Sequence, residues 1–222
     1  MARYSIDAMT ITFDDGGMNL LSSDALRELQ EIVIEWPGDR VLVFRSGRSH
    51  IFAAGADMAE MSRFTPRDAE SFARLGQETF AAIERLPIVT VAIIDGACFG
   101  GALDLALAFD LRFATPASRF SHPGARLGIV TGFGGTSRWR KVLTPAAAKQ
   151  LFLANRVLTA EEALAIGLVD RAGDSFDDEI QRLAGLDSRT TRFVKELCTH
   201  GERLTDSQRL VLADRLSRLY DS

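Results

Sequence analysis

Apolar residues along the first two thirds of the chain follow two spacings, one typical of strands and one typical of helices. Residues 9–13 form a short β-branched run, and apolar side chains recur at helical spacing across residues 23–34. Residues 41–44 and 89–94 are continuous apolar runs of strand length. Such runs are typical of strands that helices cover on both faces of a sheet. The pattern predicts strands that alternate with helices.

Threonine residues mark several predicted helix starts. Thr65 and Thr144 each precede a proline at the first helical position. Thr159 and Thr205 each stand three residues before a glutamate or glutamine that completes a capping box. From Thr144 onward the pattern is mostly helical. We therefore expect one α/β domain, in which a core formed by residues 1–143 carries a helical region formed by residues 144–222.

The composition excludes several classes of protein. The chain has 222 residues, of which 46% are hydrophobic and 25% charged, as in ordinary folded domains. The net charge is −4, and no cluster of Lys and Arg lies beside aromatic residues, which argues against nucleic-acid binding. With Cys98 and Cys198 as its two cysteines, the chain is expected to form neither a disulfide framework nor a metal site. The N-terminus lacks the apolar core of a signal peptide and no run is long enough to span a membrane, so we expect a cytoplasmic protein without membrane contact.

Three segments combine small residues with a strand-to-turn context, namely residues 52–58, 95–104 and 128–136. Small residues in such places indicate that the backbone approaches another group closely. In the second segment an apolar strand runs into Gly100 and Gly101 and then into an apolar helix over residues 102–109. Unpaired amides at the start of that helix can donate to an anionic oxygen. One amide from this segment and one from the first would form an oxyanion hole.

Two simpler interpretations compete with this one. Glycines after a strand often make only a tight turn, and each segment taken alone fits that explanation. A dinucleotide site is the second, but residues 96–101 lack the middle glycine of the G-x-G-x-x-G fingerprint and residues 132–137 lack its last glycine. The broken fingerprints argue against a nucleotide-binding oxidoreductase.

Taken in order, the segments resemble the signatures of the enoyl-CoA hydratase/isomerase (crotonase) superfamily. Residues 52–61 resemble the first signature, and residues 87–114 resemble the second, in which a strand, a Gly-Gly pair and a helix ending in Asp follow one another. Residues 128–136 resemble the third signature, and the whole resemblance spans residues 9–219. It implies an α/β fold, a crotonase-like spiral of ββα repeats with a helical C-terminal region. It also implies a homo-trimer or a dimer of trimers.

The resemblance implies an acyl-CoA substrate, of which coenzyme A is a part, and no separate cofactor. The amides of Ala56 and Gly101 match the family's two oxyanion donors. The positions expected to bind the coenzyme A and acyl groups are Ala54, Asp57, Met58, Gly100, Gly124 and Gly132. Most of these assignments concern the backbone, which suits small side chains.

The sequence departs from the family pattern at the expected acid and base. Hydratases of this family place two glutamates around the substrate double bond. Here the first position is Asp104, which is shorter than glutamate by roughly 1.5 Å, and the second is Gly124. Asp104 remains a candidate acid or base. His122, two residues before the empty position, is a candidate replacement because imidazole titrates near neutral pH, although a histidine bonded to backbone or solvent explains it equally well.

These departures leave the reaction open. We expect an acyl-CoA lyase or isomerase of fatty-acid type, with hydration, double-bond isomerisation and thioester-linked carbon–carbon chemistry all compatible. Isomerisation needs only one base and the oxyanion hole, whereas hydration is expected to be weak.

The alternative is a non-catalytic acyl-CoA-binding or assembly subunit, which the loss of one carboxylate favours. The sequence ends at Ser222, before a further helix that the resemblance implies, so we expect a pocket that is more open or completed by a neighbouring subunit.

Overall fold

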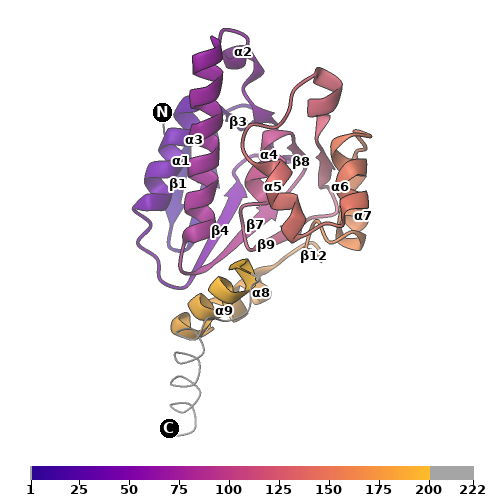
Figure 1. Ribbon diagram of the computed structural model, residues 1–222. Helices are drawn as coiled ribbons and strands as arrows, with labels where there is room; N and C mark the ends of the chain where they lie inside the picture. The colour runs from indigo at the N-terminus through magenta and orange to yellow at the C-terminus, as the bar shows by residue number, and fades with distance from the viewer. Residues whose placement is uncertain (1, 201–222) are drawn as a thin grey trace, which may run out of the picture.

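The computed structural model describes residues 2–200, and its largest element is a six-stranded sheet (Figure 1). The strands lie in the order β1-β2-β4-β7-β9-β12. β1 is antiparallel to β2, and the other neighbouring strands are parallel. Their bounds are Tyr4–Asp7 (β1), Thr10–Phe13 (β2), Val41–Ser46 (β4), Val89–Ile94 (β7), Leu111–Ala114 (β9) and Arg171–Ala172 (β12). The two apolar runs predicted as buried strands are β4 and β7, which pair at the centre of the sheet.

A second sheet has four strands in the order β11-β10-β8-β5, and a small third sheet pairs β3 with β6. Their bounds are Leu20–Leu21 (β3), Ile51–Ala53 (β5), Gly55–Ala56 (β6), Ala97–Phe99 (β8), Arg119–Ser121 (β10) and Leu158–Thr159 (β11). The chain visits the two larger sheets in turn, because β4, β7 and β9 are followed by β5, β8 and β10. A helix follows each such pair of strands. This repeated succession of strand, strand and helix is the predicted ββα spiral.

Helices begin where the sequence predicts caps. Thr65 and Thr159 each form a complete capping box, and the Thr144 side chain caps the next predicted start. The predicted start at Thr205 lies outside the described residues. The α-helices are α1 (Ser23–Ile34), α2 (Met58–Met61), α3 (Pro66–Arg85), α4 (Gly101–Ala106), α5 (Gly135–Arg138), α6 (Pro145–Phe152), α7 (Ala160–Ala165), α8 (Asp177–Ala184) and α9 (Ser188–His200), and the 3-10 helices are η1 (Pro123–Leu127) and η2 (Trp139–Lys141).

α4 is shorter than the helix predicted over residues 102–109, since it ends at Ala106. The chain then turns toward β7, where the Asp110 carboxylate accepts hydrogen bonds from the Thr90 amide at 2.8 Å and hydroxyl at 3.0 Å. A distant contact therefore overrides the local helical preference of this apolar segment.

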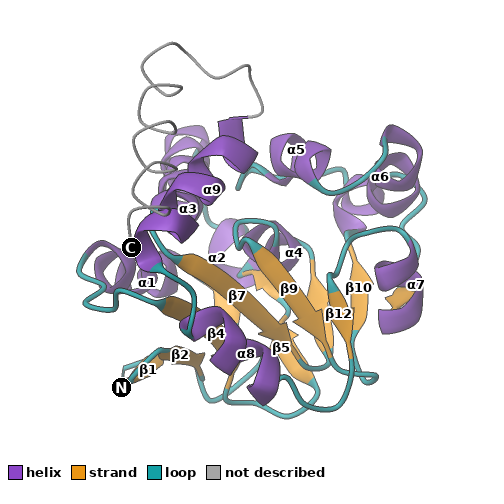
Figure 2. Cartoon of the chain, turned by 90° about the horizontal axis from the view of Figure 1, so that it is seen from below, coloured by secondary structure: helices purple, strands orange, loops and turns teal. Residues whose placement is uncertain are grey.

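Helices cover both faces of the large sheet. α1, α3 and α4 contribute to one core, in which Phe44 and Phe80 are fully buried. α8 lies on the opposite face (Figure 2), where Ile180 packs with Val91 and Phe113 in a second core. This two-sided burial explains why the central strands are continuous apolar runs.

The C-terminal part of the described chain is mostly helical, as predicted, but two short strands within it join the sheets of the preceding core. β11 pairs with β10, and β12 pairs with β9. Beside β12 the buried Arg112 guanidinium donates to the Asp170 carboxylate at 2.9 Å. Residues 158–172 are therefore built into the same sheets as the core.

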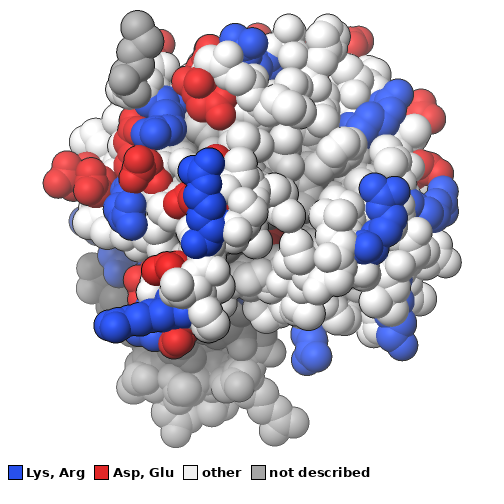
Figure 3. All heavy atoms as spheres, turned by 90° about the horizontal axis from the view of Figure 1, so that it is seen from above, with Lys and Arg blue, Asp and Glu red and all other residues white. Residues whose placement is uncertain are grey.

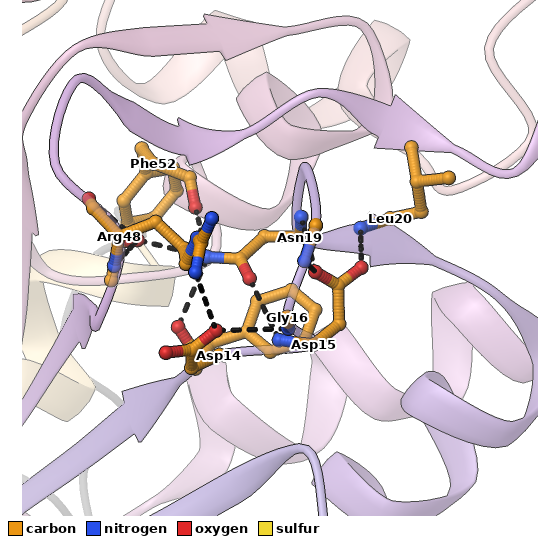
Figure 4. A network of polar contacts seen from close by, with 10 residues as sticks. Asp14, Asp15, Gly16, Asn19, Leu20, Arg48 and Phe52 are labelled. Atoms are coloured by element: carbon orange, nitrogen blue, oxygen red, sulfur yellow. Dashed lines mark hydrogen bonds and ion pairs between the residues drawn. The ribbon is translucent and has the colours of Figure 1, made fainter.

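The Asn19 side chain forms hydrogen bonds with residues of β2, β4 and β5 (Figure 4). Its backbone is left-handed, with φ +53°, and its side chain is fully buried. The side-chain amide donates to the carbonyl oxygens of Phe13 at 3.0 Å and Phe52 at 3.1 Å, and to Ser46 Oγ at 2.8 Å. β3 starts at the next residue and pairs with β6, so this network helps to set the position of β6.

Asn19→Ala is expected to lower the free energy of unfolding by about 2 to 4 kcal/mol, because two buried carbonyl groups lose their donor and a left-handed residue becomes alanine. Equilibrium urea unfolding measures this loss. Asn155→Ala is the matched control, because Asn155 also has a positive φ, +51°, while its side chain accepts one long hydrogen bond, from Ser121 at 3.3 Å. Equal losses for the two variants would contradict a special role for the Asn19 side chain.

Candidate active site

An apolar cavity of about 330 Å³ lies between α2, α3, the start of α4 and residues 122–133. Figure 3 shows the molecule from above, with a central hollow that is bordered mostly by uncharged surface. Among the described residues that line the cavity, His122 has the one ionisable side chain. The lining consists of Ala54, Gly55, Ala56, Met58, Met61, Phe64, Ala69, Phe72, Ala73, Gly100, Gly101, His122, Pro123, Gly124, Leu127, Ile129, Val130, Thr131, Gly132 and Phe133.

Two backbone amides lie close together in the wall of this cavity, those of Ala56 and Gly101. A Cβ atom added at Gly101 would lie 3.3 Å from the Ala56 nitrogen, and one added at Gly55 would lie 3.1 Å from the Gly101 nitrogen. The Asp57 amide donates to β3 at Leu21, so the preceding amide, that of Ala56, points away from β3. The Gly101 amide is the first of α4, where amides have no partner within the helix.

Asp104 lies three residues after Gly101 in α4, and its side chain is fully buried. Its Oδ2 atom accepts a hydrogen bond from the Thr131 hydroxyl. The carboxylate fits only because residue 135 is glycine, since a Cβ atom there would lie 1.8 Å from Asp104 Oδ1. Thr131 and His122, which line the cavity, both lie against this carboxylate.

His122 faces Asp104 and not the solvent. It directly precedes η1, is 5% exposed, and places Nε2 3.6 Å from Asp104 Oδ1. Its ring packs against Phe152, with ring centroids 4.8 Å apart. Within the described part of the chain, neither Nε2 nor Oδ1 makes a well-aligned hydrogen bond. These two buried atoms therefore face each other without a hydrogen bond between them.

Burial sets the protonation of this pair. It raises the pKa of Asp104 to about 7, against the opposing effects of the Thr131 hydroxyl, the Arg138 guanidinium and the nearby Gly135 amide. Burial also lowers the pKa of His122. Both shifts favour the neutral form of each group. A carboxyl group with a pKa near 7 can both release and accept a proton at neutral pH.

The position expected to hold a second carboxylate has no room for a side chain. Gly124 is buried within η1, and a Cβ atom there would lie 2.7 Å from the Ile129 carbonyl oxygen and 3.1 Å from His122 Cε1. The Ile129 amide in turn donates to the Gly124 carbonyl at 2.9 Å. Residues 124 and 129 are thus held in direct backbone contact.

The sequence matches the model of the family described as enoyl-CoA hydratase/isomerase over residues 5–211. This chain belongs to the enoyl-CoA hydratase/isomerase family. Curated relatives include the crotonyl-CoA hydratase of Syntrophomonas wolfei subsp. wolfei, 35% identical over 76% of this chain and 66% of that protein. Another is the mitochondrial methylglutaconyl-CoA hydratase of Rattus norvegicus, 36% identical over 69% of this chain and 50% of that protein. The match thus spans about half to two thirds of the length of these relatives.

Solved structures with similar sequences share the fold of this chain. Pseudomonas aeruginosa DspI superposes with a TM-score of 0.84 at 27% identity, over 98% of this chain and 93% of that one. An enoyl-CoA hydratase from Bacillus anthracis gives a TM-score of 0.87 at 25% identity, over 98% of this chain and 90% of that one. The predicted crotonase-like fold is confirmed.

Most residues that the family resemblance assigned to substrate binding line the cavity, namely Ala54, Met58, Gly100, Gly124 and Gly132. Asp57 is placed differently. Its carboxylate caps α2 by accepting hydrogen bonds from the backbone amides of Ala59 at 2.9 Å and Glu60 at 3.0 Å. This side chain is occupied with the helix end, which is the common use of aspartate at that position.

Sequence reasoning missed Thr131 and Gly135 as residues of the site. Both lie in the segment identified as the third family signature, but their contacts with Asp104 join positions 27 or more residues apart. No local pattern reveals such contacts. The local composition could have suggested Thr131, because a partly buried hydroxyl group among glycines and apolar residues needs a polar partner.

The rest of the described chain adds no second chemical centre to this family member. Its residues contain no group of three or more His, Cys, Asp or Glu side chains that could hold a metal ion. Cys98 is buried and Cys198 is exposed, and both are free thiols. Across residues 2–200, none of the helices is long and apolar enough to cross a membrane.

The free energy of unfolding of Asp104→Asn, relative to that of the parent protein, is expected to increase as the pH rises. Folded Asp104 keeps its proton up to about pH 7, whereas an unfolded aspartate loses it near pH 4. Between these values the folded state binds the extra proton, so the stability of the parent protein falls with rising pH. The free energy of unfolding of the variant, relative to the parent, should rise by about 1 kcal/mol per pH unit from pH 4 to pH 7.

Urea unfolding of both proteins across this pH range measures the slope. Asp39→Asn is the matched control for the loss of a carboxylate, because the Asp39 side chain is 89% exposed. A flat difference for Asp104→Asn would show that the buried carboxyl has an ordinary pKa.

Proposed function

We propose that this chain binds an acyl-CoA thioester in the apolar cavity and shifts a carbon–carbon double bond by moving a proton, as an enoyl-CoA isomerase does. The observation that carries the proposal is the buried Asp104 carboxyl. It faces His122 at 3.6 Å and lies three residues after Gly101, whose amide lies close to that of Ala56. An acid/base group and two adjacent donors are the minimum that this reaction requires.

The two amides supply the electrostatic part of the mechanism. The thioester carbonyl oxygen accepts hydrogen bonds from Ala56 and Gly101, which stabilise the negative charge that develops when a proton leaves the neighbouring carbon. Removing one such donor typically costs 10²- to 10³-fold in rate. Because both donors are backbone groups, their direction depends on β6 and α4 and not on side-chain rotamers.

Asp104 supplies the acid/base part. When it takes the proton, the electron pair of the broken C–H bond passes into the enolate. When the enolate collapses, Asp104 returns the proton to a second carbon, and the double bond is displaced. This proton transfer requires neither water nor a second carboxylate. Neutral His122 faces Oδ1 of Asp104.

Hydration is the second candidate, because the Syntrophomonas wolfei relative is a crotonyl-CoA hydratase. Adding water across a double bond needs a group that activates water as well as a proton donor. Gly124 stands where the second carboxylate is expected, and no side chain fits there. This observation favours isomerisation over hydration.

A non-catalytic acyl-CoA-binding or assembly subunit is the third candidate. It is favoured by the complete burial of Asp104, which separates the carboxyl from the cavity in the free protein. Under this alternative the cavity binds a thioester and leaves it unchanged. The homo-trimer or dimer of trimers that the resemblance implies and the cytoplasmic location stay predictions under all three candidates.

The lining of the cavity favours an uncharged acyl group. Met58, Met61, Phe64, Phe72 and Phe133 supply apolar surface, and among residues 2–200 no Lys, Arg, Asp or Glu lines the cavity. An acyl group with its own carboxylate would be desolvated there without a partner, which is costly. Aliphatic enoyl groups are therefore the substrates that we propose.

The deciding experiment incubates the protein with 3-enoyl-CoA, 2-enoyl-CoA and 3-hydroxyacyl-CoA and follows binding and product identity. We expect interconversion of 3-enoyl and 2-enoyl thioesters, reduced about 10²- to 10⁴-fold in Asp104→Asn and unchanged in Asp39→Asn. Formation of 3-hydroxyacyl-CoA at a comparable rate would establish hydration instead. Tight binding with no product from any thioester would establish the non-catalytic alternative.

A further inference from the structure

The buried Asp104 carboxyl contacts the cavity lining through two side chains. Oδ2 accepts the hydrogen bond of the Thr131 hydroxyl, and Oδ1 faces His122 Nε2 at 3.6 Å. Both of these residues line the cavity, whereas Asp104 itself is 0% exposed. The position and orientation of the carboxyl therefore depend on these neighbours.

Thr131 holds its carboxyl oxygen more firmly than His122 does. The hydroxyl makes a hydrogen bond, while the imidazole lies beyond hydrogen-bond distance. The segment that carries Thr131 is itself anchored to α3, because the Gln77 side-chain amide donates to the Gly132 carbonyl at 2.6 Å. A Cβ atom at Gly132 would also meet Ala73 Cβ of α3 at 3.1 Å. The hydroxyl is thus presented from a fixed backbone.

Resting on the proposed function, the geometry points to Thr131 as a positioning residue that acts through Asp104. Its hydroxyl holds Oδ2, keeps Oδ1 directed at His122, and stabilises the ionised carboxylate that must accept the substrate proton. A hydroxyl suits this role because it donates to the carboxylate and, after rotation, accepts from the carboxylic acid. Thr131 therefore serves both protonation states of Asp104.

The other charged and titratable groups near Asp104 come from three elements. Arg138 of α5 lowers the pKa of Asp104, but this guanidinium is paired with Glu84 of α3 at 2.8 Å. Cys98 of β8 is buried, and its own pKa is raised by burial and by the charge of Asp104. His122 precedes η1 and has a lowered pKa. Replacing Thr131 leaves all of these groups in place, so its effect on Asp104 can be isolated.

The test compares Thr131→Val, which keeps the shape and removes the hydroxyl, with Thr131→Ser, which keeps the hydroxyl. Thr136→Val is the matched control, because Thr136 is an exposed threonine of α5 outside the cavity lining. With the thioester that the protein converts, Thr131→Val is expected to lower kcat roughly 10-fold or more, the scale of one hydrogen bond to a charged group, while KM changes less than about 2-fold. The acidic limb of the kcat–pH profile should move to higher pH, and Thr131→Ser should restore both properties.

A second readout does not depend on activity. Carbon-13 NMR of aspartate-labelled protein, with the Asp104 signal assigned from Asp104→Asn, follows the titration of this carboxyl directly. We expect its pKa to rise in Thr131→Val and to return in Thr131→Ser. If no thioester is converted, the proposed function fails while the titration still decides the role of Thr131. An unchanged Asp104 titration in Thr131→Val, or a loss that Thr131→Ser does not restore, would overturn the inference.

Discussion

The site depends on the close approach of two backbone segments, β6 and the turn before α4. A Cβ atom at Gly55 would lie 2.6 Å from the Phe99 carbonyl oxygen, so the two chains meet without any intervening side chain. Gly55 and Gly100 both adopt positive φ angles, +99° and +54°, which glycine tolerates without steric cost. This approach brings the two amides together. It also fixes Asp104 relative to them, because three residues of helix separate Gly101 from Asp104 by a constant rise and rotation.

The same architecture creates an electrostatic conflict at Asp104. A fully buried carboxyl is stable in its charged form only with compensating donors, and here Arg138, the cation that favours ionisation, is shared with Glu84. The remaining compensation comes from neutral donors, above all the Thr131 hydroxyl. The protein therefore holds a carboxyl whose two protonation states lie close in free energy at neutral pH. Such a balance is typical of acid/base groups at active sites, and it lowers the stability of the fold.

Local patterns in the sequence predicted the elements that local physics determines. The apolar runs at residues 41–44 and 89–94 and the capping threonines act through neighbouring residues, so β4, β7 and the starts of α3, α6 and α7 were predictable. The two-residue strands β11 and β12 exist because they pair with β10 and β9, and no local signal announces such pairing. The same distinction applies to the site. Family signatures made Ala56, Gly101 and Asp104 candidates. Thr131 joins the candidate site through a contact across 27 residues, and the His122 ring packs against Phe152 of a later helix.

The direct backbone contact between Gly124 and Ile129 has a consequence for evolution. If a mutation introduced glutamate at residue 124 on this backbone, the Cβ atom of the new side chain would clash with the Ile129 carbonyl oxygen. A glutamate at this position therefore also requires the segment from 124 to 129 to shift. On this backbone, a single substitution at residue 124 therefore does not by itself supply a second carboxylate.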